Sequence, residues 1–140
     1  MVKEIEIEVR EAVPKSRKAD ILVIDDERDI SDLLSEYLNN LGYNAVPVYS
    51  GIDGLAKLEE GRYDLIITDL MMPGISGMEL INIVGEKNIN TRIIVMTGYE
   101  VIEPEAESIA KNVHGYIAKP FCLKEVQLII DRVLTKEANQ

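Results

Sequence analysis

The residue with the clearest chemical potential is Asp69, which ends a short apolar run and precedes a loop containing Pro73 and Gly74. A short run of leucine and isoleucine bounded by turn signals is typical of a strand buried on both faces. Asp69 is therefore predicted to lie where a buried strand meets the surface. Taken alone, it could simply begin a turn, because aspartate is common in turns.

Other polar residues follow apolar runs in the same way. Asp25 and Asp26 follow the first long run, and Thr97 and Lys119 follow two later ones. Because the carboxyl ends of parallel strands share one edge of a sheet, we expect these side chains to lie near Asp69. Each has an ordinary alternative, as a helix cap, a turn hydroxyl or a surface lysine. Their coincidence at the ends of four strands favours a site.

The chemistry of such a site follows from electrostatics. Two carboxylates about 4 Å apart repel by about 4 kcal/mol at an effective dielectric constant of about 20. A cation removes that repulsion, and an all-oxygen, water-accessible site suits Mg²⁺. With Mg²⁺ bound, Asp69 stays ionised and can act as a nucleophile that becomes an aspartyl phosphate. Thr97 and Lys119 would then hydrogen-bond and neutralise the phosphoryl oxygens.

The elements that must position these residues alternate as strand and helix five times. This order requires parallel strands, right-handed crossovers and helices on both faces, so the predicted fold class is α/β. The first helix is predicted to turn Leu33 inward and the second Ile52, while Ser50 and Ser76 are predicted N-caps. A fourth helix is predicted to begin near Pro104. The predicted strands are residues 21–24, 45–48, 64–69, 93–96 and 116–118.

Residues 1–18 differ from the domain predicted over residues 19–137. Ile5, Ile7 and Val9 alternate with charged residues, as in a half-exposed strand, and a basic run after Pro14 is typical of a linker. The pattern predicts a solvated arm. The alternative is an added edge strand or a strand exchanged with a second subunit, which would make the protein a homodimer.

Composition limits the classes of partner. The formal net charge of −10 disfavours direct binding to nucleic acid or to an anionic membrane, because both would repel the chain. The single cysteine, Cys122, excludes an internal disulfide, which fits a reducing cytoplasm. We find no apolar run of transmembrane length, and 46% hydrophobic residues suffice for a core.

Several short motifs lie at the predicted strand ends: Asp25-Asp26, Asp69 followed by Pro73 and Gly77, Thr97-Gly98, and Tyr116 with Lys119-Pro120-Phe121. With these motifs, residues 19 to 137 resemble the receiver domain of the response regulators of two-component signalling. The fold implied by the resemblance is a flavodoxin-like, doubly wound (βα)5 domain with a five-stranded parallel sheet of order 2-1-3-4-5.

The resemblance also implies a phosphorylation site and a metal site. Asp69 would accept phosphate from a histidine kinase or a phosphotransfer protein and become a 4-aspartylphosphate. Asp26, Asp69 and the Met71 carbonyl would bind Mg²⁺ directly, and Asp25 would bind it through water.

A switch is implied as well. Thr97 would move onto the phosphoryl group, and Tyr116 would rotate inward. Lys119 would pair with the phosphate, and its bond to Pro120 would be cis. A downstream effector protein would read the change at the face formed by the fourth helix, fifth strand and fifth helix. Such a domain phosphorylates and dephosphorylates itself without being a turnover enzyme.

Three other readings stay open. The chain could be the receiver fragment of a longer DNA-binding or enzymatic regulator, although the segment 135–140 slightly favours a stand-alone protein. A phosphatase of the haloacid-dehalogenase type also forms an aspartyl phosphate, but Asp25-Asp26 lacks that class's Asp-x-Asp spacing. A flavin carrier on the same fold is disfavoured because Asp25-Asp26-Glu27 would repel a phosphate after the first strand.

Overall fold

A computed structural model of the chain describes residues 18–87, 90–98 and 112–138. The predicted strand around residues 5–9, the linker after Pro14 and most of the predicted fourth helix lie outside these residues. Within them, no helix is long and apolar enough to cross a membrane.

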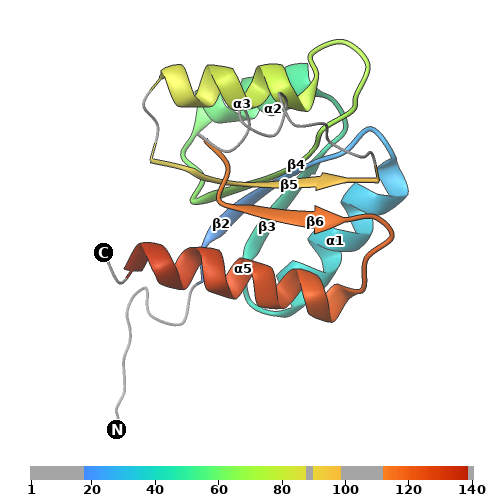
Figure 1. The fold of residues 1–140 in the computed structure, drawn as a ribbon, viewed down its shortest axis with the longest axis vertical. Helices are drawn as coiled ribbons and strands as arrows, with labels where there is room; N and C mark the ends of the chain where they lie inside the picture. The colour runs from blue at the N-terminus through green and yellow to red at the C-terminus, as the bar shows by residue number, and fades with distance from the viewer. Residues whose placement is uncertain (1–17, 88–89, 99–111, 139–140) are drawn as a thin grey trace, which may run out of the picture.

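The described chain forms a five-stranded parallel sheet with helices on both faces (Figure 1). The strand order β3-β2-β4-β5-β6 corresponds to the predicted order 2-1-3-4-5, which confirms the doubly wound, flavodoxin-like fold. The elements are β2 (Asp20–Ile24), α1 (Arg28–Asn40), β3 (Asn44–Val48), α2 (Gly51–Glu60), β4 (Leu65–Asp69), α3 (Gly77–Glu86), β5 (Arg92–Thr97), β6 (Gly115–Ala118) and α5 (Leu123–Ala138).

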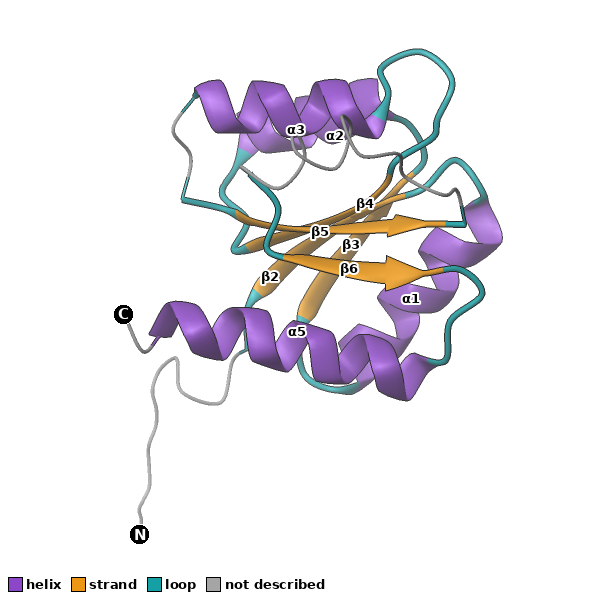
Figure 2. Ribbon diagram, in the orientation of Figure 1, coloured by secondary structure: helices purple, strands orange, loops and turns teal. Residues whose placement is uncertain are grey.

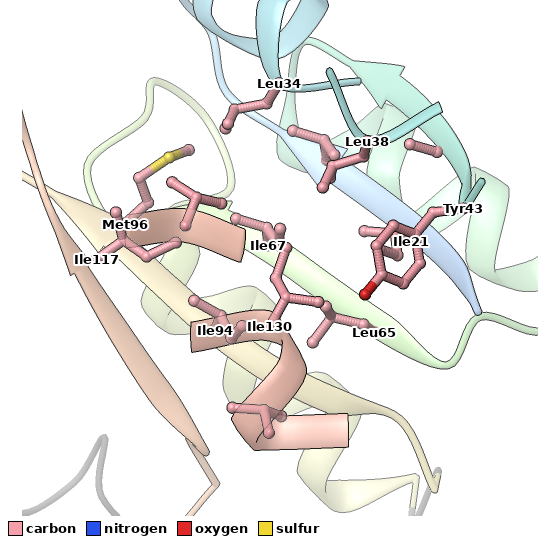
Figure 3. Close-up of a cluster of buried hydrophobic side chains, with 14 residues drawn as sticks. Ile21, Leu34, Leu38, Tyr43, Leu65, Ile67, Ile94, Met96, Ile117 and Ile130 are labelled. Carbon is pink, nitrogen blue, oxygen red and sulfur yellow. The ribbon is translucent and has the colours of Figure 1, made fainter. Parts of the chain in front are cut away.

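Two apolar layers hold the helices on the sheet, with α1 and α5 on one face and α2 and α3 on the other (Figure 2). Successive residues of a strand point to opposite faces, so Ile21 packs into the first layer and Leu22 into the second. Figure 3 shows the first layer, in which Ile67 of β4 and Ile130 of α5 lie among side chains from α1 and from the strands on either side of β4. The layers fix the strands, and therefore the edge at which they end.

The inner face of α1 differs from the prediction at Leu33, which is 48% exposed. The buried residues of this helix are Ser31, Leu34, Ser35 and Leu38. These positions follow the i, i+3, i+4, i+7 spacing of one helix face, and Leu33 lies about 100° from its neighbour Leu34 around the axis. The small serines let α1 approach the sheet closely, and the Ser31 hydroxyl contacts the carbonyl oxygens of two strands.

The prediction for α2 was wrong in the same way, since Ile52 is 62% exposed. Here the buried residues are Gly51 and Gly54, and a Cβ at Gly54 would lie 2.7 Å from Ile24 Cδ1. Glycine therefore faces the sheet where the sequence suggested an isoleucine.

The N-cap predictions are confirmed. The Ser50 hydroxyl accepts the backbone N–H of Asp53, and Ser76 forms a reciprocal capping box with Glu79.

Candidate functional site

The carboxyl ends of the parallel strands bring the predicted acids and the lysine to one edge of the sheet. Asp69 is the last residue of β4, and Asp25 directly follows β2. The backbone N–H of Asp25 still donates to Val48 of β3, at 3.2 Å. Lys119 directly follows β6, and its backbone N–H donates to the Thr97 carbonyl, at 3.0 Å. Strand pairing therefore fixes the backbone of all these positions.

The Lys119 ammonium lies at the centre of the site, between three carboxylates from two segments, the loop after β2 and the end of β4. Its Nζ is 2.8 Å from Asp25 Oδ2, 2.9 Å from Asp69 Oδ2 and 3.3 Å from Glu27 Oε1. Asp25 and Asp69 are buried, whereas the Glu27 side chain is 63% exposed. The lysine thus places one positive charge between two buried carboxylates.

The two buried aspartates are held in the same way. Asp25 Oδ1 accepts the backbone N–H of Glu27 at 2.9 Å, and Asp69 Oδ1 accepts that of Met71 at 3.1 Å. Each bond reaches two residues ahead, which is the local turn that aspartate favours. Each Oδ2 then contacts Lys119. Both carboxylates are oriented by their own turn on one side and by a distant lysine on the other.

Burial and charge act in opposite directions in this cluster. Burial raises the pKa of Asp25 above its ordinary value, although Lys119 and the Glu27 N–H favour the ionised form. For Lys119, burial alone would lower the pKa. Its hydrogen bonds and charge interactions with Asp25 and Asp69 outweigh burial and raise that pKa above its ordinary value. A positive charge at this point is therefore strongly favoured.

Asp25, Glu27 and Asp69 form a group that could hold a metal ion, with one oxygen from each lying within 4.8 Å of the others. Hard oxygen ligands at a partly open site fit Mg²⁺. Asp25 Oδ2 is buried, and among the described residues the charged group that contacts it is the Lys119 ammonium, at 2.8 Å. The chemistry of the donor set therefore fits a divalent cation.

The group includes Glu27, for which the sequence analysis predicted no metal role. The signal was present, because Glu27 directly follows the acidic pair and lies at the N-cap of α1. Asp26, predicted as a direct ligand, is exposed and is not part of this group. Its metal role stays a prediction.

The other predicted residues surround this cluster or its edge. Thr97 is half-buried at the end of β5, Met71 is exposed in the loop after Asp69, and Tyr116 on β6 is 48% exposed. The bond between Lys119 and Pro120 is cis, as predicted. The switch roles of Thr97 and Tyr116 and the ligand role of the Met71 carbonyl stay predictions.

The family model of the response regulator receiver domain matches residues 21–131, which include every residue of this cluster. The chain belongs to that family. Its buried acids and lysine thus lie within a receiver domain of two-component response regulators.

Known relatives agree with this assignment. Sporulation initiation phosphotransferase F of Bacillus subtilis is 30% identical over 119 residues, which cover 85% of this chain and 96% of the relative. Transcriptional regulatory protein CiaR of Streptococcus pneumoniae is also 30% identical, and the match covers 85% of this chain and 53% of the relative. The receiver domain spans about half the length of the first curated relatives that it matches.

A solved structure gives the same picture. The response regulator TrrA of Thermotoga maritima, solved in complex with Mg(2+)-BeF, is 33% identical and superposes with a TM-score of 0.74. The superposition covers 83% of this chain and 99% of TrrA.

Proposed function

We propose that this receiver domain is switched by Mg²⁺-dependent transfer of a phosphoryl group to Asp69. The observation that carries the proposal is the placement of the Asp69 carboxylate. It is buried at a strand end and oriented by Met71, and it lies 2.9 Å from the only ammonium group that contacts it in the described chain. An ionised carboxylate has no proton to lose, so it attacks phosphorus without a general base.

In the transfer, a carboxylate oxygen of Asp69 forms a bond to phosphorus as the bond between phosphorus and the donor breaks. The electron pair of that bond leaves with the donor group. The Lys119 ammonium, already beside Asp69, neutralises the added phosphoryl charge, and the Thr97 hydroxyl donates a hydrogen bond to the phosphoryl group.

Asp25 and Asp69 would hold the cation, with Glu27 or Asp26 as a further acid and the Met71 carbonyl as a further oxygen. When bound, Mg²⁺ neutralises the carboxylates and the incoming phosphoryl oxygens. The support is the group of three carboxylates at this edge, together with the solved complex of TrrA with Mg(2+)-BeF.

The phosphoryl donor would be a histidine kinase or a phosphotransfer protein, because response regulators work with histidine kinases and effector domains. A downstream effector would read the switch at the face that includes β6 and α5. The domain would act once per phosphorylation and lose the group by hydrolysis, without sustained turnover, and it would act in the cytoplasm without binding nucleic acid or membrane.

Two arrangements of the whole protein are open. The match to nearly the full length of phosphotransferase F supports a phosphorelay protein that acts alone. Partial matches to transcriptional regulators such as CiaR support a receiver part of a longer regulator.

The test is labelling with a small-molecule phosphodonor, acetyl phosphate, followed by peptide mapping with and without Mg²⁺. We expect one acid-stable, base-labile phosphoryl group on the peptide that contains Asp69, formed only with Mg²⁺. Label on another residue, or equal labelling without a divalent cation, would contradict the proposal. Continuous release of phosphate from a generic phosphate ester would instead support a phosphatase.

A further inference from the structure

The backbone of Asp69 is held by hydrogen bonds, as its side chain is. The Thr68 hydroxyl, which is fully buried, donates to the Asp69 carbonyl oxygen at 3.0 Å. The next backbone N–H, that of Leu70, donates to the Met96 carbonyl of β5 at 3.3 Å. The peptide group between Asp69 and Leu70 is thus fixed by a hydrogen bond at each end.

Gly77, the first residue of α3, closes on the same peptide group from the other side. A Cβ at Gly77 would overlap the Asp69 carbonyl oxygen and would lie 2.8 Å from Leu70 Cα. The Gly77 N–H donates to the Leu70 carbonyl oxygen at 3.1 Å, which closes the loop between β4 and α3 at its base.

The need for glycine at position 77 comes from this close approach and not from backbone conformation. In the described chain only Gly42 and Gly74 have positive φ angles. Gly77 also cannot easily move away, because the capping box of Ser76 and Glu79 fixes the first turn of α3 beside it. A methyl group at this position would therefore have to displace the Asp69 peptide.

Displacement of that peptide would turn the carboxylate. Asp69 Oδ1 depends on the Met71 N–H inside the closed loop, and Asp69 Oδ2 depends on Lys119 outside it. A rotation of the Asp69 backbone cannot keep both contacts at their present lengths.

We propose that Thr68 and Gly77 are positioning residues for phosphoryl transfer, which clamp the Asp69 peptide so that its carboxylate faces Lys119 and the cation. The inference rests on the proposed function of Asp69. It adds two residues that touch neither the phosphoryl group nor the cation.

The main experiment compares Gly77→Ala with Gly61→Ala, a matched control whose Cβ would meet no atom within 4 Å. Three quantities are measured on each: the rate of labelling by acetyl phosphate, the Mg²⁺ affinity by titration calorimetry, and the denaturant midpoint. For Gly77→Ala we expect labelling at least about tenfold slower, since misplacement by about 1 Å can cost a hundredfold. We also expect weaker Mg²⁺ binding by the folded protein. Gly61→Ala should match the wild type in labelling rate and Mg²⁺ affinity.

Thr68→Val keeps the shape of the side chain and removes its hydroxyl, and Thr68→Ser restores the hydroxyl. We expect Thr68→Val to label more slowly and Thr68→Ser to recover most of the rate. This pair decides the matter if Gly77→Ala does not fold.

Folded Gly77→Ala and Thr68→Val proteins that label and bind Mg²⁺ like the wild type would overturn the inference, even if their midpoints fall. Failure of the proposed function itself looks different, because the wild type would then carry no label on Asp69.

Discussion

Both edges of the sheet carry aspartates, but the surroundings of these aspartates differ. At the carboxyl edge, Asp25 and Asp69 are buried and share the Lys119 ammonium. At the opposite edge, Asp20 and Asp64 lie in exposed hydrogen bonds. The Asp64 carboxylate accepts the Asp20 backbone N–H at 2.8 Å, and the Asp20 carboxylate accepts the Asn44 amide at 2.7 Å.

This difference indicates that an aspartate becomes suited to chemistry when it is buried and lies beside a charged group. Its position at the end of a strand is not enough. These exposed acids accept hydrogen bonds from a backbone N–H and a side-chain amide, and water screens their charge, so a bound cation gains less there than at a buried pair. At the carboxyl edge, Lys119 is the one positively charged side chain that contacts the two acids in the described chain, so a metal cation can compete with it for their negative charge. Four pairs of substitutions test this contrast.

The largest contrast should come from Asp69→Asn against Asp64→Asn. We expect Asp69→Asn to reduce Mg²⁺-dependent labelling by acetyl phosphate to background, since the amide cannot act as the nucleophile. Asp64→Asn should label like the wild type. Undiminished label on Asp69→Asn, measured by intact mass, would remove Asp69 from the site.

The next contrast removes one donor from each edge. Lys119→Met leaves two buried carboxylates without their counter-charge, and we expect it to lower the free energy of unfolding by about 3 kcal/mol at neutral pH. Asn44→Ala, at the exposed edge, should cost about 1 kcal/mol or less. Urea unfolding of both variants measures the difference, and equal losses would contradict the contrast.

Acid should reduce the loss in Lys119→Met. The pKa of Asp25 is raised by burial, so the folded state prefers its protonated form. Keeping Asp25 ionised in the folded protein therefore lowers the free energy of unfolding at pH values above its pKa in the folded state. This loss of stability disappears as the pH falls toward the ordinary pKa of 3.8. Added Mg²⁺ at neutral pH should also recover stability, because it neutralises the same two carboxylates.

A smaller effect should separate the two candidate acids after β2. Asp26→Asn should weaken Mg²⁺ binding at least about tenfold if Asp26 is a direct ligand, since the loss of a group that only orients a metal ligand already costs about 10- to 100-fold in affinity. Glu27→Gln should weaken it only a few-fold, because its exposed carboxylate already contacts Lys119. Titration calorimetry measures both, and a larger loss for Glu27→Gln would make Glu27 the ligand instead.

The smallest effect concerns Tyr43, which precedes β3 at the opposite edge and donates to Asp131 at 3.0 Å. Burial, and then the hydrogen bond to Asp131, raise the pKa of Tyr43 to about 12. The raised pKa gives stability that is complete below about pH 10, the ordinary tyrosine value, and is lost as the pH rises through about 12.

Tyr43→Phe should therefore be less stable than the wild type at pH 8, with the gap narrowing above pH 10. Tyr37→Phe is the control, because Tyr37 joins α1 to α5 through the neutral Gln127 side chain. If the difference in the free energy of unfolding between the wild type and Tyr43→Phe stays constant between pH 8 and pH 11, the protonated state of Tyr43 does not contribute to stability.

The sequence by itself determined the elements and the strand ends. Apolar runs placed Asp69 and Asp25 at the edge of a parallel sheet, and Ser50 and Ser76 marked the starts of two helices. These features depend on hydrogen bonds and side-chain periodicity within a few residues, so they can be read from neighbours in the chain.

Only the tertiary structure decided which side chains meet. It buried Ser31 and Gly54 in place of Leu33 and Ile52, because how closely a helix approaches the sheet depends on both surfaces. It also placed Glu27 beside Lys119, 92 residues away in the chain, and Gly77 against the Asp69 peptide. Such contacts depend on strand register and side-chain reach across the fold, which no local pattern contains.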